Sequence, residues 1–335
     1  MNFRGILMME IKDLSENTGE WLRGSGKESD IVISSRIRLA RNITGFPFIS
    51  RANLKQKGDI ESLLRETVIK SNIAKDLSYV NLNKANAVDK LFLVERHLIS
   101  KEHAEGEGIQ LIRSGFELKN TWTTIDEIDN CLGGKLNFAF SSRFGYLTAC
   151  PTNIGTGMRG SVMLHLPALG MTKHIEKVFN AVGKLGLVVR GLYGEGTKVS
   201  GDLYQISNQF TLGKSETEIL AVIESVIPRI TSYERMARKA LILESKDQLE
   251  DRIWRSYGML KAARMITSEE ILQLLSQVRM GVNLGLINDI EMRTLNELFI
   301  LTLPGHLQKL QGCELDSTQR NIIRASYIRK RLEGI

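Results

Sequence analysis

The chain has 335 residues, a formal net charge of +7 and a hydrophobic fraction of 42%. This length exceeds what one hydrophobic core usually serves, so two domains are expected, and the composition excludes a disordered or fibrous chain. Three widely spaced cysteines exclude a disulfide framework and a structural zinc site, and no apolar stretch is long enough to span a bilayer. Glu10 and Lys12 interrupt the apolar run near the N-terminus before it reaches signal-peptide length, so the expected compartment is the cytoplasm, without a membrane partner.

From about residue 30 to about residue 215, short apolar runs alternate with stretches of helical periodicity. Residues 172–185 carry apolar side chains at helical spacing and end at Gly186, where a C-terminal capping glycine belongs. The segments with the pattern of strands are 30–33, 145–149, 161–166, 187–192 and 202–208. This alternation predicts a mixed α/β domain.

The rest of the chain is predicted to be helical. Ser215 to Glu218 matches a capping box that begins a helix, in which Pro228 is expected to cause a kink or a break. Beyond residue 238 the strand patterns disappear and three apolar stripes follow at helical spacing, the last ended by Pro304 and Gly305. Because no repeat or low-complexity linker separates the halves, we expect the two domains to pack against each other.

The loop from Cys150 to Arg159 has the residue types of a phosphate site. Its glycines let backbone N–H groups approach an anion, Thr152 and Thr156 add hydroxyl donors, and Arg159 supplies a planar guanidinium. The alternative is a tight structural turn with a buried, inert cysteine.

Two further arginine clusters favour the phosphate site. Arg36 and Arg38 follow an apolar run and, on a continuing strand, would point to the same face. A polyanion bound between them would relieve their repulsion. Arg190 ends another apolar run, beside a glycine-rich segment. Any one cluster is usually a solvated strand edge, but three of them indicate a shared anionic ligand.

Three common nucleotide motifs do not fit. Residues 155–160 match G-x-G-x-x-G, but a strand rather than a helix is expected after them and Asn180 stands where an acidic residue belongs. As a protein-kinase glycine loop, the same match lacks the HRD and DFG elements downstream. Gly213 to Ser215 resembles the end of a P-loop, yet the first glycine of that motif would fall at Asn208.

Segments 34–42, 95–100, 150–159 and 190–196 occur in the order found in the ATP:guanido phosphotransferases. The chain resembles this family over nearly its whole length, most closely the bacterial protein arginine kinases of the McsB type. The resemblance implies an α+β fold, with a phosphagen-kinase-like catalytic domain over residues 1–237, a mostly antiparallel sheet flanked by helices, and an all-helical domain over residues 238–335. It also implies transfer of the γ-phosphoryl group of ATP, with Mg²⁺, to arginine side chains of proteins.

The resemblance assigns site residues by their matching positions. Cys150 would lie beside the acceptor guanidinium, where a thiolate stabilised by arginines could orient a cation. His97 would contact the nucleotide, although a histidine with satisfied local hydrogen bonds is the alternative. The residues implied to bind nucleotide are Ser34, Ser35, Arg36, Ile37, Arg38, His97, Arg159, Gly160, Ser161, Val162, Met163, Arg190, Gly191, Leu192, Tyr193, Gly194 and Glu195.

One segment departs from the family pattern, between Ile99 and Gln110. The family has a strand pair there, an acidic segment whose glutamate handles the guanidinium, and an arginine where this chain has Gly108. A block is missing here, and Glu105 and Glu107 are the expected catalytic substitutes. Because glycine neighbours hold them loosely, we expect nucleotide binding to persist and turnover to fall at least about 10²-fold. The alternative function is a catalytically impaired pseudokinase that binds nucleotide or phosphoarginine as a scaffold.

The C-terminal half implies regulation and partners. Arg320 and Arg324 lie four apart and resemble the family's phosphoarginine-binding motif, with Asn321 in place of an aspartate. A solvated basic face is the alternative. The resemblance further implies a homodimer, protein substrates with exposed arginine, control of stress regulators, a zinc-binding activator protein and the Clp ATPase and protease. A kinase of free arginine or creatine is disfavoured because the C-terminal half lacks strands, and dispersed basic residues disfavour direct nucleic-acid binding.

Overall fold

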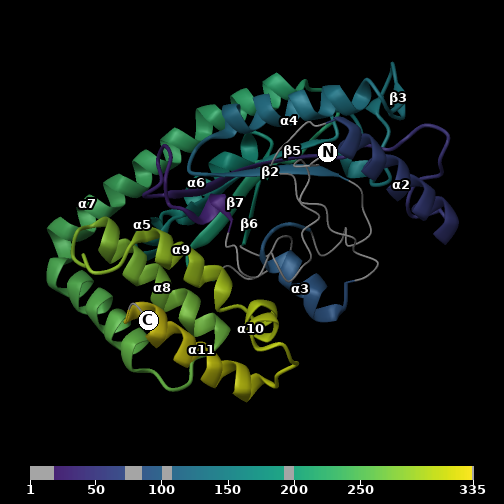
Figure 1. The fold of residues 1–335 in the computed structure, drawn as a ribbon. Coiled ribbons are helices and arrows are strands. Elements are labelled where there is room, and N and C mark those ends of the chain that lie inside the picture. The colour runs from purple at the N-terminus through teal and green to yellow at the C-terminus, as the bar shows by residue number, and fades with distance from the viewer. Residues whose placement is uncertain (1–18, 72–84, 100–107, 192–199, 334–335) are drawn as a thin grey trace.

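The computed structural model describes residues 19–71, 85–99, 108–191 and 200–333, and its centre is a five-stranded sheet (Figure 1). The strand order is β2-β1-β5-β7-β6, and every neighbouring pair is antiparallel. The strands are Val32–Leu39 (β1), Ile109–Ser114 (β2), Met158–His165 (β5), Leu187–Gly191 (β6) and Leu203–Asn208 (β7). The predicted α+β class with a mostly antiparallel sheet is confirmed.

A short hairpin precedes the Cys150 loop, where a longer strand was expected over residues 145–149. Only Gly145–Tyr146 (β4) is extended and paired, with Phe140–Ser141 (β3). The expectation failed because the chain turns: the Thr148 hydroxyl donates to the carbonyl of Cys150 at 2.8 Å, and a 3-10 turn, Pro151–Asn153 (η4), follows.

One face of the sheet is covered by the helices Leu118–Gly133 (α4) and Ile175–Lys184 (α6) and by the first half of Glu216–Ala262 (α7). Side chains from this face, including Ile37, Val162 and Ile206, share one core with Ile223 and Ile227 of α7. Pro167–Met171 (α5) contacts α7, whereas Leu54–Ser71 (α2) contacts α4. In Figure 1, α4 and α7 run along the top of the sheet.

Helix α7 passes through Pro228, so of the kink or break expected there, the break is wrong. Pro228 lacks a backbone N–H, but Val226, Ile227 and Ile230 are buried, and this packing keeps the helix continuous. The non-helical residue is Ser245, where φ is −147°. The helix therefore kinks where it leaves the sheet for the C-terminal helices.

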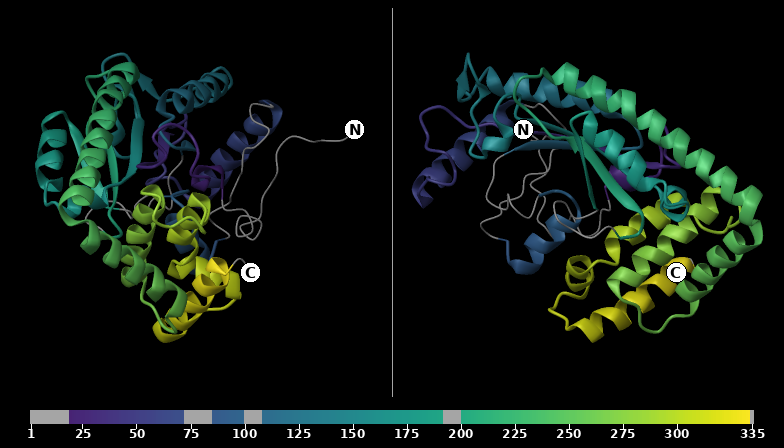
Figure 2. Two further views of the ribbon diagram at one scale, coloured as in Figure 1. Left: turned by 90° about the vertical axis from the view of Figure 1, so that its left-hand side faces the viewer. Right: turned by 180° about the vertical axis from the view of Figure 1, so that it is seen from behind.

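The C-terminal helices lie at the far end of α7, below the sheet (Figure 2). They are Ser268–Asn283 (α8), Met292–Leu301 (α9), Pro304–Gln311 (α10) and Ser317–Leu332 (α11). Their core includes Trp21 and Leu22 of the 3-10 turn Glu20–Leu22 (η1), together with Ile33 and Met163 from the second face of the sheet. Ala87–Glu95 (α3) packs against α10. The two parts thus share apolar core, as expected.

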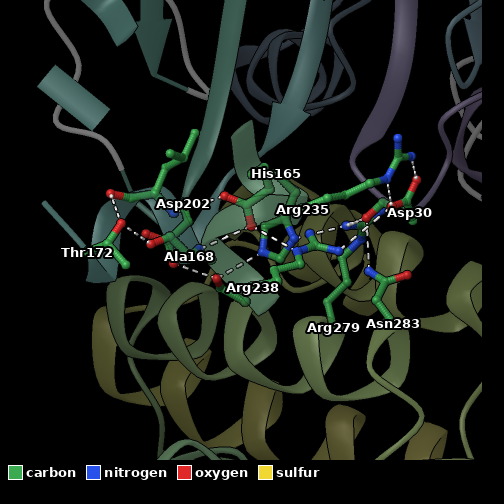
Figure 3. A network of polar contacts seen from close by, with 12 residues as sticks. Asp30, His165, Ala168, Thr172, Asp202, Arg235, Arg238, Arg279 and Asn283 are labelled. Atoms are coloured by element: carbon green, nitrogen blue, oxygen red, sulfur yellow. Dashed lines mark hydrogen bonds and ion pairs between the residues drawn. The ribbon is translucent and has the colours of Figure 1, made fainter. Parts of the chain in front are cut away.

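A buried polar network crosses from the sheet to α8 (Figure 3). Arg279 donates to the carbonyl of Asp30 at 3.0 Å and lies 2.9 Å from Nδ1 of His165. Ser276 lies 2.9 Å from His165 Nε2 and donates to Asp202 at 2.5 Å. Arg279 can only donate, so Nδ1 of His165 accepts from it. Because the Ser276 hydroxyl donates its hydrogen to Asp202, Nε2 of His165 carries the ring hydrogen and donates to Ser276. Burial, then Arg279 and Arg238, lower the pKa of His165 well below its ordinary value, so this histidine is neutral.

Candidate functional site

Three of the predicted arginines lie on the face of the sheet opposite α4 and α7. In β1, Ile37 and Leu39 enter the core under those helices, so the alternating positions of Arg36 and Arg38 project to the other face. The register places Arg38 opposite Arg159 and Arg36 opposite Ser161. Directly opposed residues of an antiparallel pair share a face, so these three guanidiniums belong to one surface.

Arg190 lies on the same face of the sheet, in β6, which is two strands away from β5. It is opposite Gln205 in β7, Gln205 is opposite Met163 in β5, and Met163 is opposite Ser34 in β1. The sheet therefore presents a row from Ser34 to Arg190 beside the row that contains Arg36 and Ser161.

The surroundings of Arg36 show how crowded these positive charges are. Its Nη2 donates to Oε1 of Gln110 at 2.7 Å. Burial, then repulsion from Arg38 and Arg159, lower the pKa of Arg36 to about 9. Arg36 remains charged at neutral pH, and a bound polyanion would stabilise it by opposing both causes.

His97 follows the end of α3 and lines a small pocket on the same face of the sheet as these arginines. The pocket is also lined by Trp21, Ser34, Arg36, Ile112, Ser161, Met163 and Gln205. His97 has φ of +58° and is 8% exposed, and the Trp21 ring meets it edge-on at 5.9 Å. Its Nε2 is buried without a hydrogen-bond partner among the described residues, and burial, then Arg36, lower its pKa to about 3. This neutral imidazole differs from the locally satisfied histidine of the alternative interpretation.

Gln110 connects His97 to Arg36. Its Nε2 donates to the carbonyls of His97 at 2.9 Å and Leu98 at 2.8 Å, while its Oε1 accepts from Arg36. Sequence reasoning used Gln110 only as a marker, and it missed Trp21 altogether. No local pattern identifies either residue, because their role depends on partners far along the chain.

The Cys150 loop enters the sheet immediately before Arg159. The Cys150 thiol is half-buried, with Sγ 3.0 Å from Oγ1 of Thr152, so it is not the fully buried cysteine of the alternative. Thr211 donates to the carbonyls of Thr152 and Ile154 at 3.0 and 2.7 Å and shapes the loop. Gly157 has φ of +61°, and a Cβ there would lie 2.5 Å from the carbonyl oxygen of Ala40, so glycine is required.

Four predicted nucleotide-binding residues have side-chain positions on the helix-covered face. Ser35 donates to the carbonyl of Gly115 at 2.9 Å and accepts from the N–H of Glu117 at 3.0 Å, which supports the start of α4. Ile37 and Val162 are core residues, and a Cβ on Gly160 would approach Ile223 of α7 at 3.2 Å. Their side chains thus build the framework, and nucleotide contact through their backbone stays a prediction.

Other predicted residues lie outside the described parts of the chain. These are Glu105 and Glu107, and Leu192, Tyr193, Gly194 and Glu195. Gly191 ends β6 and is buried. The described chain resumes at Gly108, whose Cβ position is 3.1 Å from the carbonyl oxygen of Leu39 and 3.9 Å from Cγ of Arg38. Gly108 therefore lies beside Arg38, directly before β2.

The predicted phosphoarginine-binding pair is not a matched pair of exposed arginines. Arg324 is 1% exposed and donates to the carbonyls of Thr302 at 2.7 Å and Ile266 at 2.8 Å, and to Ser268 and Asn321 at 2.7 Å each. Arg320 is half-buried and donates to the carbonyl of Leu315. Arg324 ties α11 to neighbouring segments, and Asn321 is one of its acceptors. Phosphoarginine binding by Arg320 and Arg324 stays a prediction.

Comparison with known proteins gives two family matches. Residues 107–237 match the ATP:guanido phosphotransferase C-terminal catalytic domain, and residues 246–335 match the protein-arginine kinase McsB C-terminal domain. In the part of the chain that the structure describes, no helix is both long and apolar enough to cross a membrane.

Several relatives are similar over almost their whole length. A protein-arginine kinase of Halothermothrix orenii is 44% identical over 97% of this chain and 99% of its own. One from Desulforamulus reducens is 40% identical over 98% and 99%, and one from Bacillus cereus is 40% identical over 96% and 98%.

Solved structures share the fold. Lombricine kinase has a TM-score of 0.51 and 20% identity, over 70% of this chain and 72% of that one. A duplicated taurocyamine kinase from Schistosoma mansoni has a TM-score of 0.52 and 21% identity, over 71% of this chain and 39% of that longer one. Together with the near-complete similarity to the curated relatives, these matches place the chain in the protein-arginine kinase family of ATP:guanido phosphotransferases.

Proposed function

We propose that this chain transfers the γ-phosphoryl group of ATP to arginine side chains of protein substrates. The observation that supports this most is the grouping of Arg36, Arg38, Arg159 and Arg190 on one face of the sheet. Phosphoryl transfer depends on positioning and charge neutralisation more than on covalent help. Four guanidiniums on a rigid sheet supply both.

The nucleotide phosphates would bind to the arginine face, and the imidazole of His97 would contact an adjacent part of the nucleotide. A neutral imidazole with an unused Nε2 can accept or donate one hydrogen bond according to its tautomer. Mg²⁺ neutralises phosphate charge in such reactions and is usually bound by few carboxylates plus the substrate phosphates. We therefore propose that it enters with ATP, since the described residues include no group of at least 3 His, Cys, Asp or Glu side chains able to hold a metal.

The acceptor guanidinium would lie near Cys150, where the loop enters β5. For transfer, a guanidinium nitrogen loses a proton and attacks the γ-phosphorus while the bond to the bridging oxygen of ADP breaks. Glu105 or Glu107 is proposed to take that proton, because a carboxylate is the group suited to this task. No contact among the described residues favours the scaffold alternative over the kinase.

The chain-level assignments are proposed on the family resemblance. Residues 1–237 would form the catalytic domain and residues 238–335 a helical domain for dimerisation and phosphoarginine sensing. Protein substrates with exposed arginine, stress regulators among them, a zinc-binding activator and the Clp machinery would be the partners, in the cytoplasm. Sedimentation at tens of micromolar is the test of the homodimer, and a monomer at that concentration would refute it.

A phosphotransfer assay tests the proposed reaction. The purified chain, Mg²⁺ and γ-labelled ATP are incubated with an unfolded, arginine-containing protein, and with the same protein in which every arginine is replaced by lysine. We expect acid-labile label on the arginine form and none on the lysine form. Acid-stable label, or equal labelling of both, would refute arginine as the acceptor.

A further inference from the structure

Glu95, in the last turn of α3, binds the N-terminus of α10. Its carboxylate accepts from the backbone N–H groups of Gly305 at 2.8 Å and His306 at 3.0 Å, and from Nδ1 of His306 at 3.0 Å. Glu95 is 3% exposed, so this charge is held away from water. Three donors and the positive end of a helix dipole stabilise it there.

The rest of the contact between α3 and α10 is close. The ring of Phe92 lies 4.4 Å from that of His306, and Lys309 meets Asp89 at 2.5 Å near the start of α3. A Cβ on Gly305 would lie 2.8 Å from Glu95 Oε2 and 2.8 Å from the backbone nitrogen of Phe92. Glycine at this position therefore lets the two helices approach each other.

The end of α3 that Glu95 fixes is also the end that presents His97. The backbone N–H of His97 donates to the carbonyl of Val94 at 2.9 Å, and the left-handed conformation of His97 ends the helix. Since only Arg96 separates Glu95 from His97, a shift of this turn moves the imidazole relative to Arg36.

We propose that Glu95 is a positioning residue of the nucleotide site. Its contact with α10 fixes the last turn of α3, and through that turn the C-terminal helices set the place of His97 opposite Arg36. This inference rests on the proposed function, because it assumes that His97 contacts ATP. Glu95 itself touches no nucleotide in this scheme and acts through His97.

Two substitutions change the contact from opposite sides. Glu95→Gln keeps the size of the side chain but replaces one acceptor oxygen with an NH₂ group, which cannot accept from α10. Gly305→Ala pushes α10 away without altering α3. The matched control is Lys309→Ala, which removes an ion pair between the same two helices at the other end of α3.

The readout is the Kd of Mg-ATP by titration calorimetry, at a temperature where each variant is shown to be folded. We expect Kd to rise about tenfold for Glu95→Gln and for Gly305→Ala, and to stay unchanged for Lys309→Ala. In a background that carries His97→Ala, the Glu95→Gln effect should disappear, because the two residues act through one contact. A loss of stability alone would not produce that non-additivity.

The outcomes separate this inference from the proposed function. If the unaltered chain binds no ATP, the nucleotide site and this inference both fail. If it binds ATP and both variants retain the same Kd, Glu95 has only a structural role. An equal Glu95→Gln effect with and without His97 would also overturn the inference, and if Glu95→Gln fails to fold, Gly305→Ala in the two backgrounds decides it.

Discussion

Arg38 of β1 lies directly opposite Arg159 of β5, in adjacent strands and on the same face of the sheet. Like charges in directly opposed positions destabilise a sheet unless something compensates them. Arg36 is next to this pair, and burial, then repulsion from both arginines, lower its pKa. The sheet therefore bears a concentration of positive charge that an anionic ligand would relieve.

The first prediction concerns this charge. Arg159→Ala and Arg190→Ala should each weaken ATP binding at least about tenfold, because a charge-assisted bidentate contact is lost. The control is Arg255→Ala, on an exposed face of α7, which should bind ATP like the unaltered protein. Titration calorimetry measures the affinities, and unchanged values in both site variants would refute the arginine face as the phosphate site.

The second prediction concerns access to the Cys150 thiol. ATP together with an arginine peptide should slow the alkylation of Cys150, because both ligands would lie near the loop that leads to Arg159. The exposed Cys313, between α10 and α11, serves as the internal control and should react at an unchanged rate. Mass spectrometry follows each site, and equal rates for Cys150 with and without ligands would place the acceptor elsewhere.

The third prediction concerns the shortened segment before β2. Glu105→Gln or Glu107→Gln should lower arginine phosphorylation about 10²-fold while the Kd of ATP stays the same, because the carboxylate handles the acceptor and not the nucleotide. The unaltered chain is itself expected to turn over at least about 10²-fold more slowly than a relative with the full segment. Full turnover in both glutamine variants would show that neither carboxylate takes part.

The fourth prediction concerns stability in acid. The folded-state pKa of His97 is about 3 against an ordinary value of 6.5, with burial as the largest cause. Between these values the unfolded chain binds more protons than the folded one, so the free energy of unfolding falls as the pH falls. Each histidine of this kind contributes up to about 1.4 kcal/mol per pH unit in that window.

His97→Asn should remove this contribution, since asparagine tolerates the positive φ. The loss of stability between pH 6.5 and pH 5 should become about 1.5 kcal/mol smaller than in the unaltered protein. Denaturant unfolding at both pH values provides the measurement, with the exposed His174→Asn as control. An identical pH dependence in His97→Asn would mean that the buried ring does not resist protonation.

The fifth prediction separates the two C-terminal arginines. Arg324→Ala should lower the free energy of unfolding by about 2–4 kcal/mol, because it leaves buried acceptors such as the carbonyls of Thr302 and Ile266 without a donor. Arg320→Ala should cost less than about 1 kcal/mol, since its described bond is a single one at the edge of α11. An equal decrease in the free energy of unfolding for both variants would mean that the difference in burial between Arg324 and Arg320 does not determine their contributions to stability.

Local pattern was sufficient for much of the fold. The strand-like runs at 161–166 and 202–208 and the capping box at Ser215 are found close to their expected places, because alternation and capping depend on near neighbours. The alternation of β1 also put Arg36 and Arg38 on one face. The break expected as one outcome at Pro228 does not occur, because the packing of Ile227 and Ile230, which local rules do not contain, outweighs the lost hydrogen bond.

The site was only partly predictable, because it too depends on contacts between residues far apart in the chain. Arginines beside glycine-rich loops suggested a phosphate site, but the register that groups Arg159 with Arg38 comes from pairing across 121 positions of the chain. Glu95 and Gly305 are 210 residues apart, and no sequence pattern in either segment predicts their contact. The burial of Arg324 could not be predicted either, because the spacing of Arg320 and Arg324 indicates a shared helix face but not how deeply each side chain is buried.

The continuity of α7 affects how the protein unfolds. Its first half belongs to the core between the sheet and its covering helices and its second half to the core of the C-terminal helices, and Leu241 packs against both. A cut between Ala237 and Arg238 would divide this helix and separate Arg238 from Glu234, its partner at 2.9 Å. Neither half can melt without exposing apolar surface of the other, so heat should unfold the chain in a single cooperative transition.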